Sequence, residues 1–367
     1  MVLIVVGTSF FLFSKQSNIA EKINKTDSLK IAEKIKVLGR SLFYDRRLSV
    51  NNSRACATCH NPDFAFTDGY KKSIGAFADL HQRNSLPLFN LSYLKYFTAA
   101  DSSLQNVMIQ MDKPLFGIHP IEMGAAGNEE KILQRLKEDT LYKRLFKGAF
   151  NNVSNAVSFS NIKKAISVFI LSIRSDSSPY DCYKRGDSNA LSLDQKNGMG
   201  LFFSQKFNCS SCHGGGNFST PTLRDSFAKT IFYFNTGLYN VDGCGGYPKD
   251  DQGLFSQTKN AADMGKFRVP TLRNLAFTAP YLHDGSAATI TEVVNIFLNG
   301  GRNIAIGINK GKGCNNPYKY AGLQQIESTA GERMMLISFL YSLSDSSFLK
   351  KQAYSNPFAV DETDGYK

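Results

Sequence analysis

The sequence predicts a mainly helical protein made of two similar domains joined by long, ordered loops. The pattern C-x-x-C-H occurs twice, at residues 56–60 and 209–213, and each copy follows a run with apolar residues at helical spacing. Glycine, asparagine and proline are frequent at 214–286, which argues against long helices or strands there. With 367 residues, the chain is long enough for two domains.

Both C-x-x-C-H copies have the pattern of a c-type haem attachment site. In this pattern two thiols bond covalently to the porphyrin, and the adjacent histidine binds the iron. The expected residues are Cys56, Cys59 and His60 for haem 1, and Cys209, Cys212 and His213 for haem 2. A pair of zinc or redox sites is the alternative. However, zinc ribbons keep their cysteine pairs roughly 15–20 residues apart, and a redox pair needs no adjacent histidine.

The N-terminal segment predicts export to the periplasm. Residues 2–13 are almost wholly apolar, which is short for a membrane span but suits the core of a signal peptide. We therefore expect a signal peptide or an N-terminal membrane anchor at 1–15, and a flexible lead-in at the polar, lysine-rich 16–30. The first haem domain is expected at 31–177 and the second at 178–367.

Apolar residues recur at helical spacing in several segments. Helices are expected over 30–43, 128–148, 160–173, 190–205, 289–299 and 328–345. In the first of these helices, Ile31, Ile35, Leu38 and Leu42 fall on one face, and we expect that face to be buried.

The formal net charge of +12 favours acidic partners, and no basic-aromatic run indicates nucleic-acid binding. Three of the seven cysteines lie outside the two motifs. Cys244 and Cys314, in glycine-rich loops of an exported protein, are candidates for a disulfide. Cys182 would then be a free thiol.

Further motifs follow in order between about Leu38 and Leu343. They are Leu42-Phe43-Tyr44-Asp45, Ser73-Ile74-Gly75, Arg83-Asn84, His119-Pro120-Ile121-Glu122-Met123, Ser178-Pro179-Tyr180-Asp181, the segment 267–274 (FRVPTLRN) and the segment 278–285 (TAPYLHDG). With these motifs the chain resembles the bacterial di-haem cytochrome c peroxidase/MauG family. Segments 212–219 and 234–240 are most similar to its MbnH branch. The resemblance implies two cytochrome c-like domains that face each other, each with one covalent haem.

The resemblance also implies where peroxide chemistry takes place. In this family haem 1 is the peroxide site, and a glutamate beside it acts as acid and base, with a glutamine nearby. Glu122 matches that glutamate. Gln110 matches the glutamine, although a register with Val107 at that position stays open. The chemistry independently suits Glu122, since a carboxylate above the iron can take a proton from one peroxide oxygen and return it to the other.

A calcium ion between the domains is likewise implied by the resemblance. Its ligands would be the side-chain oxygen of Asn84 and the backbone oxygens of Thr278 and Pro280, and a hard cation suits such oxygen ligands. His283, in the H-D-G motif, is expected to have a structural role or to contact a haem propionate. It is not expected to bind iron.

The sequence departs from the family at the expected haem 1 pocket. Family members that need reductive activation carry a histidine soon after Ser-Ile-Gly, which blocks the first iron. Here that position is Ala76. His81 lies five residues further on and is out of register. We therefore expect haem 1 to be open to peroxide without prior reduction.

Two further departures concern haem 2 and the path between the haems. The distal ligand position of haem 2 is Phe297, which cannot bind iron, and Met264 is a conceivable substitute. The chain has no tryptophan, whereas the family places one between the haems. Tyr93, Tyr96 and Phe97 are the candidates to replace it.

The predicted function is that of a periplasmic di-haem peroxidase-type oxidoreductase. It uses hydrogen peroxide at haem 1 to oxidise a residue of a partner protein, which the MbnH-like features suggest is a tryptophan of an MbnP-like protein. One alternative is a cytochrome c peroxidase that removes peroxide with electrons from a small redox protein. Another is a non-enzymatic electron-transfer or haem sensor protein, which the losses at haem 2 favour.

Overall fold

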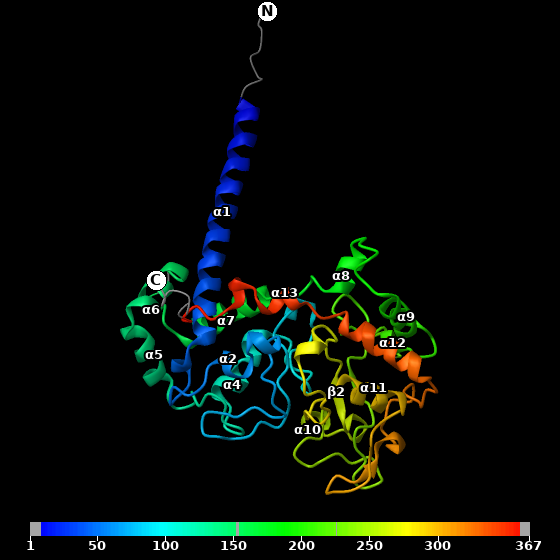
Figure 1. Ribbon diagram of the computed structural model, residues 1–367. Coiled ribbons are helices and arrows are strands. Elements are labelled where there is room, and N and C mark those ends of the chain that lie inside the picture. Colours follow the sequence, from blue (N-terminus) through cyan, green and yellow to red (C-terminus); the bar gives the residue numbers. More distant parts are fainter. Residues whose placement is uncertain (1–8, 152–153, 225, 360–367) are drawn as a thin grey trace, which may run out of the picture.

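The computed structural model describes residues 9–151, 154–224 and 226–359, which form two helical lobes lying side by side (Figure 1). The predicted mainly helical class is confirmed. The helices are α1 (Ser9–Tyr44), α2 (Cys56–Cys59), α3 (Val107–Gln110), α4 (Asp112–Phe116), α5 (Glu129–Glu138), α6 (Thr140–Ala149), α7 (Phe159–Ser172), α8 (Pro179–Lys184), α9 (Leu193–Phe203), α10 (Phe255–Thr258), α11 (Ile290–Leu298), α12 (Ala330–Tyr341) and α13 (Ser346–Leu349). The strands β1 (Tyr233–Asn235) and β2 (Lys266–Arg268) form one antiparallel pair, and β3 (Asn303–Ile304) and β4 (Gly311–Lys312) form another.

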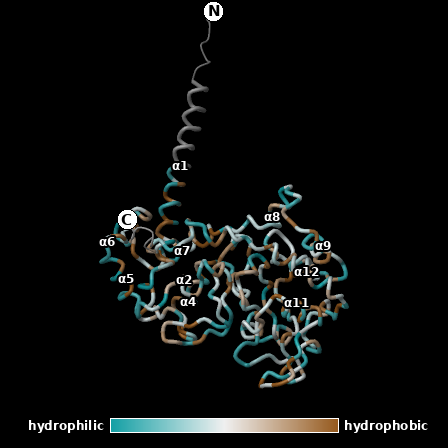
Figure 2. Tube along the Cα trace, viewed as in Figure 1, coloured by the Kyte–Doolittle hydropathy of each residue, from teal (hydrophilic) through white to brown (hydrophobic). Residues whose placement is uncertain are grey.

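The first lobe is built where the end of α1 packs against α7 and α6. Leu38, Leu42 and Phe43 of α1 are fully buried there, together with Phe169 of α7. Ile31 is 42% exposed, against expectation, because this turn of α1 lies outside the lobe, before the helix reaches the core. Figure 2 shows hydrophobic and hydrophilic residues interleaved along the helices of both lobes, as expected for helices with one buried face.

The second lobe repeats this arrangement with α9 packed against α12. Phe202 of α9, Phe339 of α12 and Phe218 of the loop after the second motif are buried together, with ring centroids 5.2–6.4 Å apart. Helix α11 also packs against α12. The helix that precedes each C-x-x-C-H motif is thus the main support of its lobe.

In each lobe a glycine allows the two main helices to approach closely. A Cβ at Gly39 of α1 would overlap the backbone carbonyl of Ala165 on α7, and a Cβ at Gly198 of α9 would overlap that of Met335 on α12. No larger residue fits these crossings without moving one helix away from its partner.

Replacing Gly198 by alanine is expected to lower the free energy of unfolding by about 1–3 kcal/mol, because the added methyl group forces the helices apart. Gly200 on the same helix is the matched control, since a Cβ there meets no atom within 4 Å. Alanine at Gly200 is expected to stabilise the protein by roughly 0.5–1 kcal/mol. Guanidinium unfolding followed by circular dichroism measures both variants. Equal effects in the two would contradict the close approach at Gly198.

Across 16–30, where a flexible lead-in was expected, α1 runs without interruption and extends away from the lobe (Figure 1). No glycine or proline interrupts the sequence from Ser9 to Leu38. Ion pairs one turn apart, such as Glu33 with Lys36 at 2.6 Å, support an exposed helix. Most of the predicted signal peptide or anchor at 1–15 lies outside the described residues. Within the described part of the chain, no helix combines the length and apolar character that crossing a membrane requires.

The helix expected over 128–148 is two helices, because Asp139 begins the second. Its backbone is extended and its side chain accepts a hydrogen bond from the Tyr142 N–H at 3.0 Å, which makes Asp139 the N-cap of α6. The remaining expected helices are present within a few residues of their predicted ends, namely 160–173 as α7, 190–205 as α9, 289–299 as α11 and 328–345 as α12.

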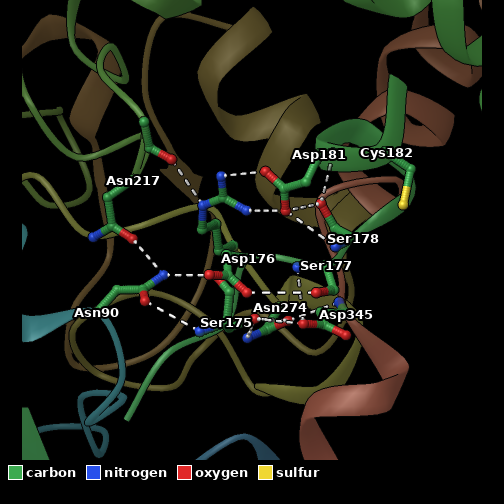
Figure 3. Close-up of polar contacts among 12 residues, drawn as sticks. Asn90, Ser175, Asp176, Ser177, Ser178, Asp181, Cys182, Asn217, Asn274 and Asp345 are labelled. Atoms are coloured by element: carbon green, nitrogen blue, oxygen red, sulfur yellow. Dashed lines mark hydrogen bonds and ion pairs between the residues drawn. The ribbon is translucent and has the colours of Figure 1, made fainter. Parts of the chain in front are cut away.

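The segment between the lobes is held by buried polar side chains from both of them (Figure 3). Asn90 of the first lobe donates to the Ser175 carbonyl at 2.9 Å and accepts from the Ser175 N–H at 3.1 Å. Asn274 of the second lobe donates to Ser175 Oγ and accepts from the Asp345 N–H, both at 2.9 Å. Each lobe therefore binds the connecting segment directly.

The segment after α12 returns to the first lobe. Phe348 is buried in the first-lobe core with its ring 5.7 Å from that of Phe66, and the Tyr44 hydroxyl donates to the carbonyl of Tyr354. The part of the chain expected to form the second domain, 178–367, thus also contributes to the core of the first lobe.

Cys244 and Cys314 are not bonded to each other, and the thiol of Cys314 lies 3.1 Å from Asn303 Oδ1. The candidate disulfide between them is therefore absent from the structure. Cys182 is a free thiol beside Arg185, 3.4 Å from its guanidinium.

Candidate functional site

The first C-x-x-C-H motif forms a single helical turn, α2, which ends at His60. Thr58 Oγ accepts a hydrogen bond from the Ala55 N–H at 3.0 Å and closes the start of the turn. His60 Nδ1 lies 3.0 Å from the carbonyl oxygen of Phe66. Because a carbonyl can only accept, Nδ1 carries the proton and Nε2 keeps its lone pair.

The second motif reproduces this arrangement with a 3-10 turn at Cys209–Ser211. His213 Nδ1 lies 3.0 Å from the carbonyl oxygen of Phe218. Burial lowers the pKa of both His60 and His213, which favours the neutral imidazole that a metal ligand must be.

An unusual backbone conformation aims these carbonyls at the histidines. Phe66 has φ of 61° and Phe218 has φ of 51°, in the left-handed region that costs a non-glycine residue of order 1–3 kcal/mol. Both rings are fully buried in the cores of their lobes. Burial of a phenylalanine ring contributes about 1.5–3 kcal/mol, which offsets the backbone cost.

The residues at each motif fit a covalently bound c-type haem. Two cysteine side chains and a neutral histidine nitrogen come from five consecutive residues, with the other ring nitrogen held by a backbone carbonyl. Cys56, Cys59 and His60 would hold one haem, and the corresponding residues of the second motif would hold the other.

The geometry does not favour the alternative of zinc or redox cysteine pairs. Burial raises the pKa of Cys56 and of Cys209 to about 12, so neither thiol has the lowered pKa of a redox-active cysteine. Within the described ranges, no group of three or more histidine, cysteine, aspartate or glutamate side chains is placed to hold a metal ion.

Glu122 is fixed near the first motif by backbone hydrogen bonds on both sides. The Ala76 N–H donates to the carbonyl of Glu122 at 2.8 Å, and the Met123 N–H donates to the carbonyl of Pro114 at 3.0 Å. Burial is the largest influence on the pKa of His60, and the charge of Glu122 acts in the opposite direction. Glu122 is therefore close enough to the first motif for its charge to be felt there.

The side-chain partner of Glu122 is His81. His81 Nε2 lies 2.9 Å from Glu122 Oε1. The nitrogen that could bind iron thus faces the carboxylate, and His81 is a direct neighbour of the expected catalytic group. Because Ala76 also contacts Glu122 through its backbone, the loop 73–81 lines this side of the site.

Gln110 lies at the end of α3, one turn before Pro114, and is partly exposed. Val107, the alternative in the sequence register, is buried in the first-lobe core. The contact that the structure shows at the Glu122 carboxylate is with His81 Nε2, and Gln110 remains a prediction.

The residues expected to bind calcium lie where the lobes meet. The Asn84 N–H donates to the carbonyl of His283 at 2.8 Å, and Asn84 Nδ2 donates to the carbonyl of Tyr70 at 2.7 Å. Thr278 and Pro280 belong to the same loop as His283. Asn84 is therefore joined to the loop that carries the other two candidate ligands.

His283 has a structural environment. Its ring stacks on Phe267 with centroids 3.7 Å apart, and burial lowers its pKa to about 4. Next to it, Arg83 of the first lobe forms a bidentate ion pair with Asp251 of the second, at 2.7 and 2.8 Å. The Arg83-Asn84 motif therefore joins the lobes through one ion pair and one backbone hydrogen bond.

The residues expected near haem 2 lie on separate elements. Phe297 is partly buried on α11, and Met264 packs against the small core of Leu238, Tyr239 and Tyr247. No sixth ligand of haem 2 follows from these positions.

One candidate for the path between the haems lies across the boundary of the lobes. The ring of Tyr96 contacts Phe232 and Tyr233 of the second lobe, with centroids 5.2 and 5.5 Å apart. Phe97 instead packs against the first-lobe core, and Tyr93 is 59% exposed. Of the three candidates, Tyr96 is therefore the residue whose ring contacts aromatic residues of the second lobe.

Sequence reasoning missed two features of this site. The first is the role of the Phe66 and Phe218 carbonyls as partners of the two histidines. The sequence offered one sign of it, because a phenylalanine followed by threonine or serine occurs shortly after each motif. The second is the pairing of His81 with Glu122. No local pattern in the sequence indicates it, since 41 positions separate the two residues.

Comparison with known proteins agrees with this geometry. A family model described as di-haem cytochrome c peroxidase matches residues 33–189. Cytochrome-c peroxidase IdrP1 of Pseudomonas sp. (strain SCT) is 32% identical over 336 residues, 87% of this chain and 83% of that protein. Cytochrome c551 peroxidase of Pseudomonas aeruginosa is 31% identical over 77% of this chain and 76% of its own length.

Among solved structures, a MauG-like protein associated with microbial copper homeostasis superposes with a TM-score of 0.85 at 40% identity, covering 89% of this chain and 94% of that one. The two repeated histidine turns, the loop that carries Glu122 and these relatives lead to the same assignment. The chain belongs to the di-haem cytochrome c peroxidase/MauG family, whose members are peroxidase-type oxidoreductases with two c-type haems.

Proposed function

We propose that this protein is a periplasmic enzyme that uses hydrogen peroxide at haem 1 to oxidise a residue of a partner protein. The observation that carries the proposal is the Glu122 carboxylate, fixed near the first C-x-x-C-H turn and paired with His81 at 2.9 Å. The likeness to the MauG-like structure favours a protein as the substrate. An MbnP-like partner with a tryptophan target is the specific form of the proposal.

When bound, haem 1 supplies the iron that takes up peroxide and the electrons that reduce it. Glu122 takes a proton from one peroxide oxygen and returns it to the other, which then leaves as water. His60 is held in the ligating tautomer by the Phe66 carbonyl. Ala76, a small residue with its N–H on Glu122, leaves the pocket open, so that no prior reduction is needed.

Tyr96 and Tyr233 are proposed to carry charge between the two halves in place of the missing tryptophan. Their rings are in contact and tyrosine is the most readily oxidised aromatic residue that the chain offers there. Asn84, Thr278 and Pro280 are proposed to bind a calcium ion that fixes the two lobes beside this route.

A second candidate function is peroxide removal with electrons from a small redox protein. It is favoured by relatives named cytochrome c peroxidases that cover most of the chain. The two functions share the peroxide step and differ in which molecule is oxidised.

Mass spectrometry of an MbnP-like partner after incubation with the di-haem protein and peroxide tests the proposal. We expect oxidation of one tryptophan, with a much lower yield when Tyr96 is replaced by leucine. Rapid oxidation of a reduced small cytochrome c, with the partner protein left unmodified, would instead assign the chain to the peroxidases.

A further inference from the structure

Beside the Glu122 carboxylate lies a histidine that the sequence did not connect with the reaction. We propose that His81 is the positioning residue of Glu122, which holds the carboxylate in the orientation that its proton transfer requires. This inference rests on the proposed peroxide step at haem 1 and assigns one further residue to it.

The loop that carries His81 is attached to Glu122 at two points. The Ala76 N–H donates to the Glu122 backbone carbonyl at 2.8 Å, and His81 Nε2 meets the Glu122 carboxylate at 2.9 Å. A Cβ at Gly75 would overlap the carbonyl of Ile121, so the loop and the 121–123 segment are in close contact. The carboxylate therefore has a fixed orientation relative to its own backbone.

The base of the loop is fixed as well. The His81 N–H donates to the carbonyl of Ser73 at 2.9 Å, and the Ser73 hydroxyl donates to the buried carboxylate of Asp68. Both Ser73 and Asp68 are buried. A histidine held at its backbone and at its ring loses little further freedom when peroxide enters, which is the requirement for a positioning group.

The charges around His81 favour its protonated form. Burial acts to lower the pKa of His81, but the hydrogen bond and charge of Glu122 and the charge of Asp68 outweigh it, and the pKa is raised despite the opposing charge of Arg83. The charge of His81 in turn acts to lower the pKa of His60. A protonated His81 attracts the Glu122 carboxylate by its charge as well as by contact, so the pair is held more firmly than a neutral pair would be.

The atoms balance without any change in His81 itself. The proton on one peroxide oxygen passes to Glu122, the O–O bond breaks, and the same proton passes to the departing oxygen, which leaves as water. The electron pair that this oxygen takes comes from the O–O bond, and a bound haem would supply the two electrons that the remaining oxygen needs. His81 keeps its proton and its hydrogen bond throughout.

The test compares His81→Gln with the wild-type di-haem protein by stopped-flow absorption. The glutamine amide nitrogen can still donate to Glu122, but it carries no charge. We expect the peroxide rate constant to fall roughly ten- to a hundredfold, the range that a charge-assisted hydrogen bond allows. The wild-type rate should also fall as the pH rises and His81 loses its proton, and this alkaline limb should be absent in the variant.

Cyanide binding gives a readout that does not depend on peroxide chemistry. Hydrogen cyanide must give up a proton before it binds ferric iron as cyanide, so its association rate reports on the same pair. We expect a loss of roughly tenfold in His81→Gln with an unchanged resting spectrum. His119→Gln is the matched control, because His119 is exposed and only three residues from Glu122.

The outcomes separate the two proposals. Wild-type rates and an unchanged pH profile in His81→Gln, with Glu122→Gln slow, would overturn the role of His81 alone. A resting low-spin spectrum that becomes high-spin in His81→Gln would also overturn it, because His81 would then be an iron ligand. If the variant binds cyanide slowly and the wild type does not react with peroxide, the positioning role stands and the proposed function fails.

Discussion

Glu122→Gln is expected to slow the reaction of the diferric protein with hydrogen peroxide by about 10²- to 10⁴-fold, the contribution usual for a general acid–base group. Glutamine keeps the shape of the side chain and an oxygen that can accept from His81, but it cannot take a proton. Stopped-flow absorption of the as-isolated protein measures the rate without a reductant. The same experiment tests whether haem 1 is open, as Ala76 predicts.

Glu129→Gln is the matched control, because it makes the same chemical change at an exposed residue in the first turn of α5. Its rate is expected to equal that of the wild type. A Glu122→Gln protein that reacts as fast as Glu129→Gln would contradict the role of Glu122. A wild-type protein that is low-spin at both haems and inert to peroxide would contradict the open pocket.

Asp181→Asn is expected to lower the free energy of unfolding at neutral pH by about 3–5 kcal/mol, the cost of leaving a buried charge without its partner. Asp181 accepts two hydrogen bonds from Arg273 at 2.7 and 2.8 Å, and both side chains are largely buried. It also accepts from the Ser178 N–H at the start of α8 (Figure 3). Asparagine preserves the size of the side chain, removes the charge and replaces one accepting oxygen by an NH2 group that can only donate.

The pH dependence of this loss has a definite sign. Burial acts to raise the pKa of Asp181, but the hydrogen bonds and charge of Arg273 outweigh it, and the pKa is below the ordinary value of 3.8. A carboxyl group with a lowered pKa stabilises the folded state above its unfolded pKa, and this stabilisation disappears as the pH falls through the folded pKa. The difference between Asp181→Asn and the wild type should therefore shrink below about pH 4.

Guanidinium unfolding at several pH values measures this effect. Asp187→Asn is the control, because Asp187 is exposed on the same segment, and its effect is expected to stay within about 0.5 kcal/mol. Equal unfolding midpoints for Asp181→Asn and the wild type at pH 7 would show that Arg273 needs no charge partner there.

Much of the fold was predictable because it depends on residues that are close together in the sequence. The helices that precede the two C-x-x-C-H motifs follow from apolar residues at helical spacing, and the position of each histidine at the end of a short turn follows from the motif itself. The division of 128–148 into two helices could also have been predicted, since aspartate, the residue at position 139, is a common N-cap. The continuous α1 was missed because a polar, lysine-rich composition was read as flexibility, although no residue there interrupts a helix.

The site was predictable only in part. Motif resemblance singled out Glu122 and Asn84, while the C-x-x-C-H pattern gave the two histidine turns. The structure joins Asn84 to the loop that carries Thr278 and Pro280. The resemblance did not identify His81, whose distance in the sequence from Ala76 suggested a residue outside the pocket. The loop 73–81 folds back on itself, with the His81 N–H on the Ser73 carbonyl, and that turn brings the imidazole to the carboxylate.

The sequence by itself thus determined the two haem turns and the helices that support them, because these depend on residues within a few turns of one another. The type of chemistry followed from the motif resemblance. Only the tertiary structure decided which carbonyl orients each histidine, which side chain meets Glu122, and that Phe348 returns to the core of the first lobe. These contacts depend on left-handed backbone at single residues and on packing between distant segments. Neither leaves a periodic signal in the sequence, because each is fixed by the sum of many burial and hydrogen-bond terms across the whole fold.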